Sequence, residues 1–137
     1  MGLLIDTSVF IQLERSGGSP TALLDSVGDQ PVYLAAISAS ELLHGVHRAN
    51  SAVRRNRRER FVEAILDLVP ALPFDLEIAK VHSRLWADLA SRGEMIGAHD
   101  LLIAATALFH QHTVATSNAR EFGRVEGLDL VVWPESG

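Results

Sequence analysis

The chain has 137 residues, 47% of them hydrophobic, and 17 Asp plus Glu outnumber 12 Lys plus Arg to give a formal net charge of −5. A chain of this length and composition builds an ordinary buried core, so we expect residues 1–137 to form a single domain. The absence of cysteine excludes disulfides, zinc–thiolate sites and thiolate nucleophiles, and it agrees with a reducing cytoplasm as the expected location.

The start of the chain predicts a short buried strand followed by a helix. The apolar segment GLLI covers residues 2–5, and a helix over residues 8–15 ends before the turn at Gly17 and Gly18. Asp6 interrupts the apolar run too early for a secretory signal, and no apolar run approaches the length of a membrane span. We therefore expect no association with a membrane.

The next segments predict two helices with a strand between them. Ser19 and Pro20 suit the N-cap and the first position of a helix that runs to residue 27. The segment VYLAA, residues 32–36, predicts a second strand, and residues 38–48 follow as a helix.

Two longer helices are predicted in the middle of the chain, separated by an extended segment between two prolines. The first covers residues 51–69, and its inner face is expected to carry Val53, Phe61, Ile65 and Leu68. Pro70 and Pro73 bound the extended segment. The second helix covers residues 75–91 and ends before Gly93, with Ile78, Val81, Leu85 and Leu89 at helical spacing.

The last part of the chain predicts alternating helices and strands. A helix begins at Asp100, a strand covers residues 113–116, a turn of helix covers 118–122, and a final strand covers 128–133. Strands that alternate with helices imply a parallel sheet covered on both faces, so the predicted fold class is α/β.

Four acidic residues stand where a strand or a turn passes into a helix: Asp6, Glu41, Asp100 and Glu121. Groups at the carboxyl ends of parallel strands converge on one crevice, so these carboxylates are expected to meet there. Carboxylates held together repel one another and require a cation. Because the ligands are oxygens and no thiol is present, the expected ion is Mg²⁺, with Mn²⁺ as the alternative.

Helix capping is the competing explanation for each of these acids. Asp6 could cap the first helix, and Asp100 could favour a first helical turn. Ser38 with Glu41 fits the capping box S-x-x-E, and the turn before Glu121 imitates it. Asp6 differs because it follows an apolar strand, and Asp100 differs because an ionised side chain in an apolar stretch is costly.

Half of the basic residues gather in one segment, which contains Arg48, Arg54, Arg55, Arg57, Arg58 and Arg60. The net negative charge argues against general affinity for nucleic acid, but such a segment can meet phosphates locally. We assign Arg54, Arg57 and Arg58 as candidate contacts to an RNA backbone. A solvated helix face, with Glu59 among the arginines, is the alternative.

Histidines provide weaker signals. His44 and His47 lie three residues apart and could chelate a metal, but a surface or interface role is favoured because no third ligand has suitable spacing. His99, beside Asp100, could approach a substrate phosphate.

Four segments of the chain resemble a known family in order and in spacing. They are LLIDTSVFI at the start, SASELLHGV near residue 40, IGAHDLLIAATAL near residue 100, and TSNAREFGRVEGLDLVVW at the end. Together they resemble the PIN-domain ribonucleases of VapC type, toxins of bacterial and archaeal VapBC toxin–antitoxin pairs. The resemblance spans essentially the whole chain.

This resemblance implies a fold, an activity and partners. The implied fold is a PIN-like three-layer α/β/α sandwich with a mostly parallel central sheet. The implied activity is Mg²⁺-dependent endonucleolytic cleavage of RNA. The implied partners are a second copy in a homodimer and a cognate VapB-type antitoxin that lays a segment across the active site.

The resemblance also assigns residues. The three principal acids of the family fall on Asp6, Glu41 and Asp100, which would hold the metal ion. Its variable fourth position falls on the turn that contains both Asn118 and Glu121, so either can be the fourth catalytic residue. Hydroxyl groups close to these positions could hydrogen-bond the ligands or a substrate phosphate, namely those of Thr7, Ser8 and Thr116.

Three other functions compete with a metal-dependent ribonuclease. One is a catalytically inactive PIN-like module that binds RNA or protein. Another is a haloacid-dehalogenase-like phosphatase, which is disfavoured because Ser8 stands where a second Asp is normally expected. The third is metal-free cleavage of RNA by the histidines, which a chelator would distinguish.

Overall fold

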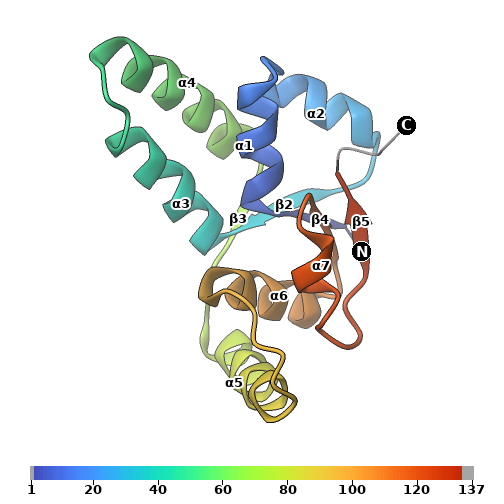
Figure 1. Cartoon of the computed structure of the whole chain (residues 1–137). Coiled ribbons are helices and arrows are strands. Elements are labelled where there is room, and N and C mark those ends of the chain that lie inside the picture. Colours follow the sequence, from blue (N-terminus) through green and yellow to red (C-terminus); the bar gives the residue numbers. More distant parts are fainter. Residues whose placement is uncertain (1, 134–137) are drawn as a thin grey trace.

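The computed structural model describes residues 2–133, and its centre is a five-stranded sheet in which every neighbouring pair of strands is parallel (Figure 1). The strand order is β3-β2-β1-β4-β5. The strands are β1 (Leu3–Ile5), β2 (Val32–Ala35), β3 (Ala71–Leu72), β4 (Thr113–Thr116) and β5 (Leu130–Val132). The predicted α/β class is confirmed, and the extended segment between Pro70 and Pro73 is the edge strand β3.

The sheet is buried on both faces because its central strand is apolar throughout. All three residues of β1 are buried, and successive side chains of a strand point to opposite faces. Leu3 and Ile5 therefore enter one core while Leu4 enters the other.

Four helices cover the first face, with a core centred on Phe10, Leu34 and Ile65 (Figure 1). They are α1 (Thr7–Arg15), α2 (Pro20–Val27), α3 (Ala36–His47) and α4 (Ala52–Leu68). The predicted start of α2 is confirmed, because the Ser19 side chain accepts a hydrogen bond from the Ala22 N–H ahead of Pro20.

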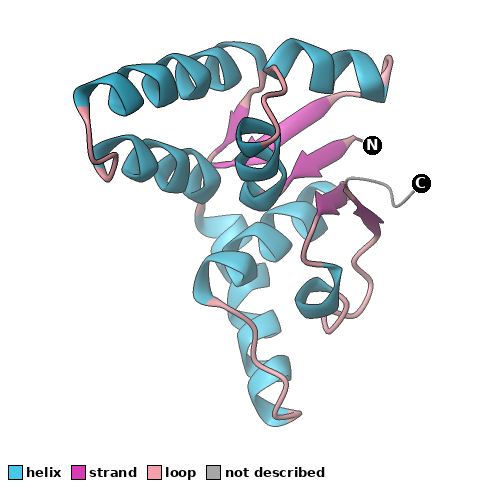
Figure 2. Ribbon diagram, turned by 45° about the horizontal axis from the view of Figure 1, so that its top comes forward, coloured by secondary structure: helices cyan, strands magenta, loops and turns pink. Residues whose placement is uncertain are grey.

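Three helices cover the second face, with a core that includes Leu4, Leu89, Ile103 and Phe122. They are α5 (Leu76–Ser91), α6 (Ala98–His110) and α7 (Ala119–Phe122). The strands therefore lie between two helical layers, as Figure 2 shows, and the predicted α/β/α sandwich is confirmed.

The predicted inner face of the long helix α4 is wrong in two positions. Val53 is 68% exposed and Leu68 is 45% exposed, whereas Val62 and Ile65 are buried. The buried positions continue one turn later at Val69. The first turns of α4 extend beyond the sheet together with the end of α3 (Figure 1), so Val53 has no layer beneath it to pack against.

The strand order creates a switch point beside β1. From β1 the chain moves outward through β2 to β3, crosses by α5 and α6, and returns to β4 on the other side of β1. A crevice forms outside the carboxyl ends of strands where the order reverses in this way. In this protein those ends are Asp6 after β1 and the turn from Thr116 after β4. Within residues 2–133, no helix is long and apolar enough to cross a membrane.

The observed orientation of α4 predicts unequal effects of the same substitution at two valines. Val62→Ala should lower the free energy of unfolding by about 1.5–3 kcal/mol, because it removes buried methyl groups and leaves a cavity. Val53→Ala should change it by less than about 0.5 kcal/mol, because Val53 is exposed. Urea unfolding monitored by circular dichroism measures both. A larger loss for Val53→Ala than for Val62→Ala would show that α4 packs with the orientation expected from the sequence.

Candidate active site

Asp6 is the innermost acid of the crevice. Its backbone N–H continues the parallel pairing of β1 with β4 by donating to the Ala115 carbonyl (2.9 Å), and its side chain is only 3% exposed. Ser8 Oγ donates to Asp6 Oδ2 at 2.6 Å, and Thr116 Oγ1 donates to the same oxygen at 2.8 Å. Asp6 stands at the N-cap of α1, but its side chain makes no capping hydrogen bond. Capping therefore does not explain this carboxylate.

The two hydroxyl groups that hold Asp6 also bind the backbone of the opposite turn. Ser8 Oγ accepts from the Ser117 N–H (3.2 Å), and Thr116 Oγ1 accepts from the Asn118 N–H (2.8 Å). Each hydroxyl donates to the carboxylate and accepts from the backbone, so its orientation is fixed at both ends. The ends of β1 and β4 are thus joined through Asp6.

Glu41 bridges two helices, and the predicted capping box is wrong. Helix α3 begins at Ala36, so Ser38 lies inside its first turn, and the Ser38 hydroxyl has no hydrogen-bond partner among the described residues. Glu41 Oε1 accepts from Thr7 Oγ1 (2.9 Å), and Glu41 Oε2 lies 3.3 Å from His99 Nδ1. Its carboxylate therefore contacts α1 and α6 and caps neither.

Asp100 and Glu121 form a hydrogen-bonded pair of acids. Asp100 lies in the first turn of α6 and is half-buried. Burial, the hydrogen bond to Glu121 and the negative charges of the neighbouring acids raise the pKa of Asp100 from its ordinary 3.8 to about 7. The hydrogen bond from Asp100 lowers the pKa of Glu121, although burial opposes this shift. Asp100 therefore holds the proton of the pair.

Asn118 supports Glu121. Asn118 Nδ2 donates to Glu121 Oε2 at 3.1 Å, and the Asn118 side chain makes no capping bond to α7. This contact and the charge of Arg124 add to the lowering of the Glu121 pKa. Of the two residues proposed for the fourth position, Glu121 is the one that hydrogen-bonds Asp100.

The charges of three acids act on the fourth, because Asp6, Glu41 and Glu121 each raise the pKa of Asp100. Within residues 2–133, no three acidic or histidine side chains are gathered closely enough to form a ready-made metal cage. The donors are carboxylate oxygens with hydroxyls behind them, a set that suits a hard cation. Mg²⁺ usually keeps several waters and uses only one or two carboxylates, so this chemistry fits a hydrated Mg²⁺.

The predicted basic contacts do not gather at this crevice. Arg58 Nη1 donates to the Gly45 carbonyl (2.9 Å), and Arg58 Nε lies 3.4 Å from Glu14 Oε1, so this guanidinium joins α1, α3 and α4. Arg54 and Arg57 are exposed, and Arg54 Nη1 donates to Asn50 Oδ1 at 3.2 Å.

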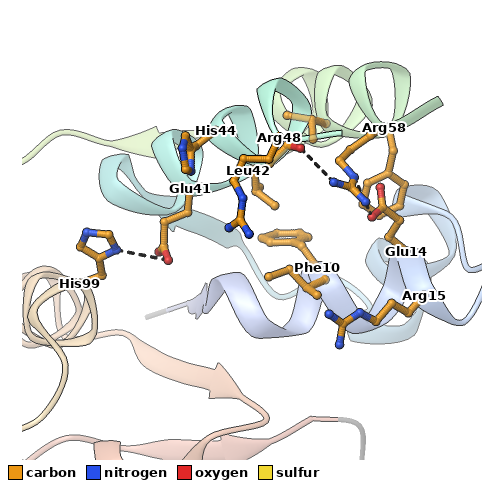
Figure 3. A pocket seen from close by; sticks show the side chains of 13 residues that line it. Phe10, Glu14, Arg15, Glu41, Leu42, His44, Arg48, Arg58 and His99 are labelled. Atoms are coloured by element: carbon orange, nitrogen blue, oxygen red, sulfur yellow. Dashed lines mark hydrogen bonds and ion pairs between the residues drawn. The ribbon is translucent and has the colours of Figure 1, made fainter. Parts of the chain in front are cut away.

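A groove adjoins the crevice, and its lining includes Arg15, which was not identified from the sequence, together with Arg48 and Arg58 of the predicted arginine segment. This α1–α3 groove has a volume of about 520 Å³. Its lining includes Phe10, Arg15, Glu41, Arg48, Arg58 and His99 (Figure 3). One end is the contact between Glu41 and His99, so the groove and the crevice are continuous. Of the two histidines considered as metal ligands, His44 lines this groove.

Comparison with known proteins identifies the family. The sequence profile of the PIN domain matches residues 3–128. The chain is 39% identical over 131 residues to Ribonuclease VapC1 of Rickettsia felis, covering 96% of each chain. It is 35% identical to Toxin FitB of Neisseria gonorrhoeae, covering 88% of this chain and 90% of that one.

Solved structures agree. VapBC2 from Rickettsia felis, bound to a promoter DNA fragment, superposes with a TM-score of 0.86 at 22% identity over 97% of this chain and 99% of that one. FitAcB from Neisseria gonorrhoeae superposes with a TM-score of 0.81 at 33% sequence identity, covering 93% of this chain and 95% of that one. VapBC-5 from Mycobacterium tuberculosis, a member of the VapBC family of toxin–antitoxin systems, superposes with a TM-score of 0.72 at 28% sequence identity. The match covers 96% of this chain and 95% of that one. The chain therefore belongs to the PIN-domain family, among its VapC-type proteins.

Proposed function

We propose that this protein is a Mg²⁺-dependent endoribonuclease that acts as the toxin of a type II toxin–antitoxin pair. The observation that carries the proposal is the convergence of four acids from four separated segments on one crevice, where burial, the hydrogen bond to Glu121 and the charges of the neighbouring acids together raise the pKa of Asp100 to about 7. A protein gains nothing in stability from such a cluster, so a bound cation is the simplest reason for it. The relatives named ribonuclease and toxin support the same function.

Asp6 and Asp100 would hold the ion, and Glu41 would complete the cluster or position the attacking water. When bound there, Mg²⁺, or Mn²⁺ in its place, would supply activation of a water for in-line attack on phosphorus and neutralisation of charge on the phosphate oxygens. Ser8 and Thr116 keep Asp6 oriented, and Thr7 does the same for Glu41. The pair of Asp100 and Glu121 can take up or release a proton near neutral pH.

The proposal includes two protein partners. A VapB-type antitoxin fits an acidic crevice that attracts a basic side chain, and solved complexes of similar proteins carry both components in their names. A second copy of this chain, in a homodimer, would cover apolar side chains that α5 leaves exposed, such as Leu76 and Trp86.

Removal of a carboxylate charge should abolish cleavage without unfolding the protein. Asp6→Asn, Glu41→Gln and Asp100→Asn should each slow Mg²⁺-dependent cleavage of labelled RNA by roughly a hundredfold or more, the scale of losing a transition-state electrostatic contact. Gln at position 41 can still accept the hydrogen bond from Thr7, so the fold should be retained. Cleavage rates and melting temperatures are measured side by side.

Glu59→Gln is the matched control, because Glu59 is exposed on α4 and outside the crevice. Its cleavage rate should equal that of the parent. If all three crevice variants cleaved RNA at the parent rate, the metal–carboxylate mechanism would be wrong. A parent that bound RNA but never cleaved it with Mg²⁺ or Mn²⁺ would instead identify an inactive binding module.

Asp100 should make the metal-free protein less stable as the pH rises. Its pKa is raised from 3.8 to about 7, so between these values the unfolded chain has lost a proton that the folded protein keeps. The contribution of protonated Asp100 to the free energy of unfolding therefore falls as the pH rises from 3.8 to about 7, and it is fully lost above pH 7. Asp100→Asn should raise the melting temperature in EDTA by more at pH 8 than at pH 5. The rise in melting temperature should be larger at pH 8 than at pH 5 by about 2–8 °C. This corresponds to a change of about 1 kcal/mol in the free energy of unfolding, reduced for solvent screening because Asp100 is half-exposed.

Mg²⁺ provides the complementary measurement on the same two proteins. At pH 8 it should raise the melting temperature of the parent, because an ion bound only by the folded state stabilises that state. It should raise that of Asp100→Asn much less. Equal responses of both proteins to Mg²⁺ would place the ion away from Asp100.

The toxin component of the proposal predicts a growth phenotype. Expression of the chain alone should arrest growth of a bacterial host, and co-expression of the product of an adjacent short reading frame should restore it. The Asp6→Asn variant is the control, because it should be harmless alone while still binding that product. Unchanged growth with abundant folded parent protein would show that the chain is not a toxin in that host.

A further inference from the structure

The loop that connects α5 to α6, residues 93–97, lies against the acidic crevice at its last residue. Gly97 stands directly before the turn of α6 that carries Asp100. A Cβ added at Gly97 would lie 3.5 Å from Asp100 Oδ2 and 4.0 Å from Glu121 Oε2. The Gly97 backbone also hydrogen-bonds Glu121. The position of the 93–97 loop therefore sets where these two carboxylates meet.

Two arginines fasten the 93–97 loop to the turn that follows α7. Arg124 Nη1 donates to the Met95 carbonyl at 2.8 Å, and Arg92 Nη2 donates to the Arg124 carbonyl at 2.9 Å. Arg92 is itself held by Asp88, one turn earlier on α5, through hydrogen bonds of 2.8 and 3.1 Å. The two fastening contacts run in opposite directions between segments that are 29 and 32 residues apart.

The apolar core holds the same loop from its other side. Ile96 is 5% exposed and belongs to the second core, with Leu89 and Phe122. Met95, in contrast, is 41% exposed, and the contact of its carbonyl with Arg124 is exposed as well. Water can replace an exposed hydrogen bond with little change in stability, so the fold does not require this arginine. What the contact adds is a fixed position of the loop.

Arg124 also lies close to the carboxylate pair. Its backbone N–H donates to the Glu121 carbonyl at 3.1 Å, so one turn carries both side chains. The hydrogen bond from Asp100 is the main cause that lowers the pKa of Glu121, and the positive charge of Arg124 adds to it. Arg92 is paired instead with two acids of its own segment. Arg124 therefore combines the loop contact with a charge beside the pair.

We propose that Arg124 is a positioning residue of the active site, which fixes the 93–97 loop so that Asp100, paired with Glu121, is held where the metal ion would bind. Arg92 supports the same loop from the α5 side. This inference rests on the proposed function and names residues that serve it without touching the ion or the RNA. Mg²⁺ demands near-ideal octahedral geometry, so a small displacement of a carboxylate is costly.

The test compares Mg²⁺ binding, measured by calorimetry without RNA, with cleavage of labelled RNA. Loss of a positive charge beside the acids should, by charge alone, tighten Mg²⁺ binding. Arg124→Met should instead weaken Mg²⁺ binding about tenfold and lower kcat about tenfold at saturating Mg²⁺, the scale of losing a group that orients a ligand. The KM for RNA should change by less than about twofold. The melting temperature in EDTA should change by less than about 2 °C, because the contact is exposed.

Three further variants separate position from charge. Arg124→Lys keeps the charge and one donor for the Met95 carbonyl, so kcat should stay within about threefold of the parent. Arg120→Met removes the same charge from an exposed position of α7 directly before Glu121, and it should keep the parent kcat and bind Mg²⁺ at least as tightly. Arg92→Met releases the loop from the α5 side, so it should weaken Mg²⁺ binding and lower kcat, as Arg124→Met does.

The outcomes distinguish positioning from other roles of Arg124. Parent values of kcat and of Mg²⁺ affinity in Arg124→Met would overturn the proposal. A raised KM with an unchanged kcat would make Arg124 a contact to RNA and would overturn it as well. A fall of more than about 5 °C in the melting temperature in EDTA, which Arg124→Lys did not restore, would show a purely structural role.

The same measurements keep this proposal apart from the proposed function. A parent that cleaves RNA, with Arg124→Met cleaving at the same rate, would leave the nuclease intact and remove the positioning role. A parent that binds Mg²⁺ in a manner dependent on Arg124, but never cleaves RNA with Mg²⁺ or Mn²⁺, would support the positioning role and overturn the nuclease.

Discussion

The structure depends on one buried carboxylate, that of Asp6, which two hydroxyl groups hold at the seam between β1 and β4. Ser8 reaches it from the start of α1, and Thr116 reaches it from the end of β4. Both hydroxyls also bind backbone N–H groups of the turn that leads to Asn118, so the carboxylate fixes the strand ends and the turn together. A buried charge is tolerated only with such partners. The parallel pairing of β1 with β4 is what brings residues about 110 positions apart into this contact.

The remaining acids add to the crevice at a cost in stability. Glu41 is balanced by a hydroxyl and by the nearby imidazole of His99, but Asp100 keeps its proton to about pH 7 because its surroundings are half-buried and negative. The two apolar cores on either face of the sheet supply the stability that the crevice does not. Residues that destabilise a fold in this way are typical of a site maintained for binding or chemistry.

The sequence predicted those parts of the fold that arise from local patterns. Apolar runs followed by an acid marked the strand ends, and Ser19 with Pro20 marked a helix start. The capping box at Glu41 misled because β2 ends at Ala35 and α3 starts directly after it at Ala36, two residues before the serine that imitates a cap. Of the arginine segment only Arg48 and Arg58 line the groove, because sequence proximity does not show which side of α4 faces it. The spacing of Glu41 and Arg48 on α3 was a usable signal, but only the packing of α1 beside α3 shows what it faces.

The crevice is acidic, whereas the groove beside it carries both signs of charge, because Glu14 and Glu41 line it together with three arginines. An RNA strand approaching the acids alone would be repelled, so a cation at the crevice would favour its binding there. A basic segment of a protein partner would instead bind the acids directly. Under the proposed function, the two ligands would then compete for the carboxylates, and inhibition and substrate binding would both converge on Asp6 and its neighbours. They would differ in that RNA requires the cation, whereas a basic segment takes its place.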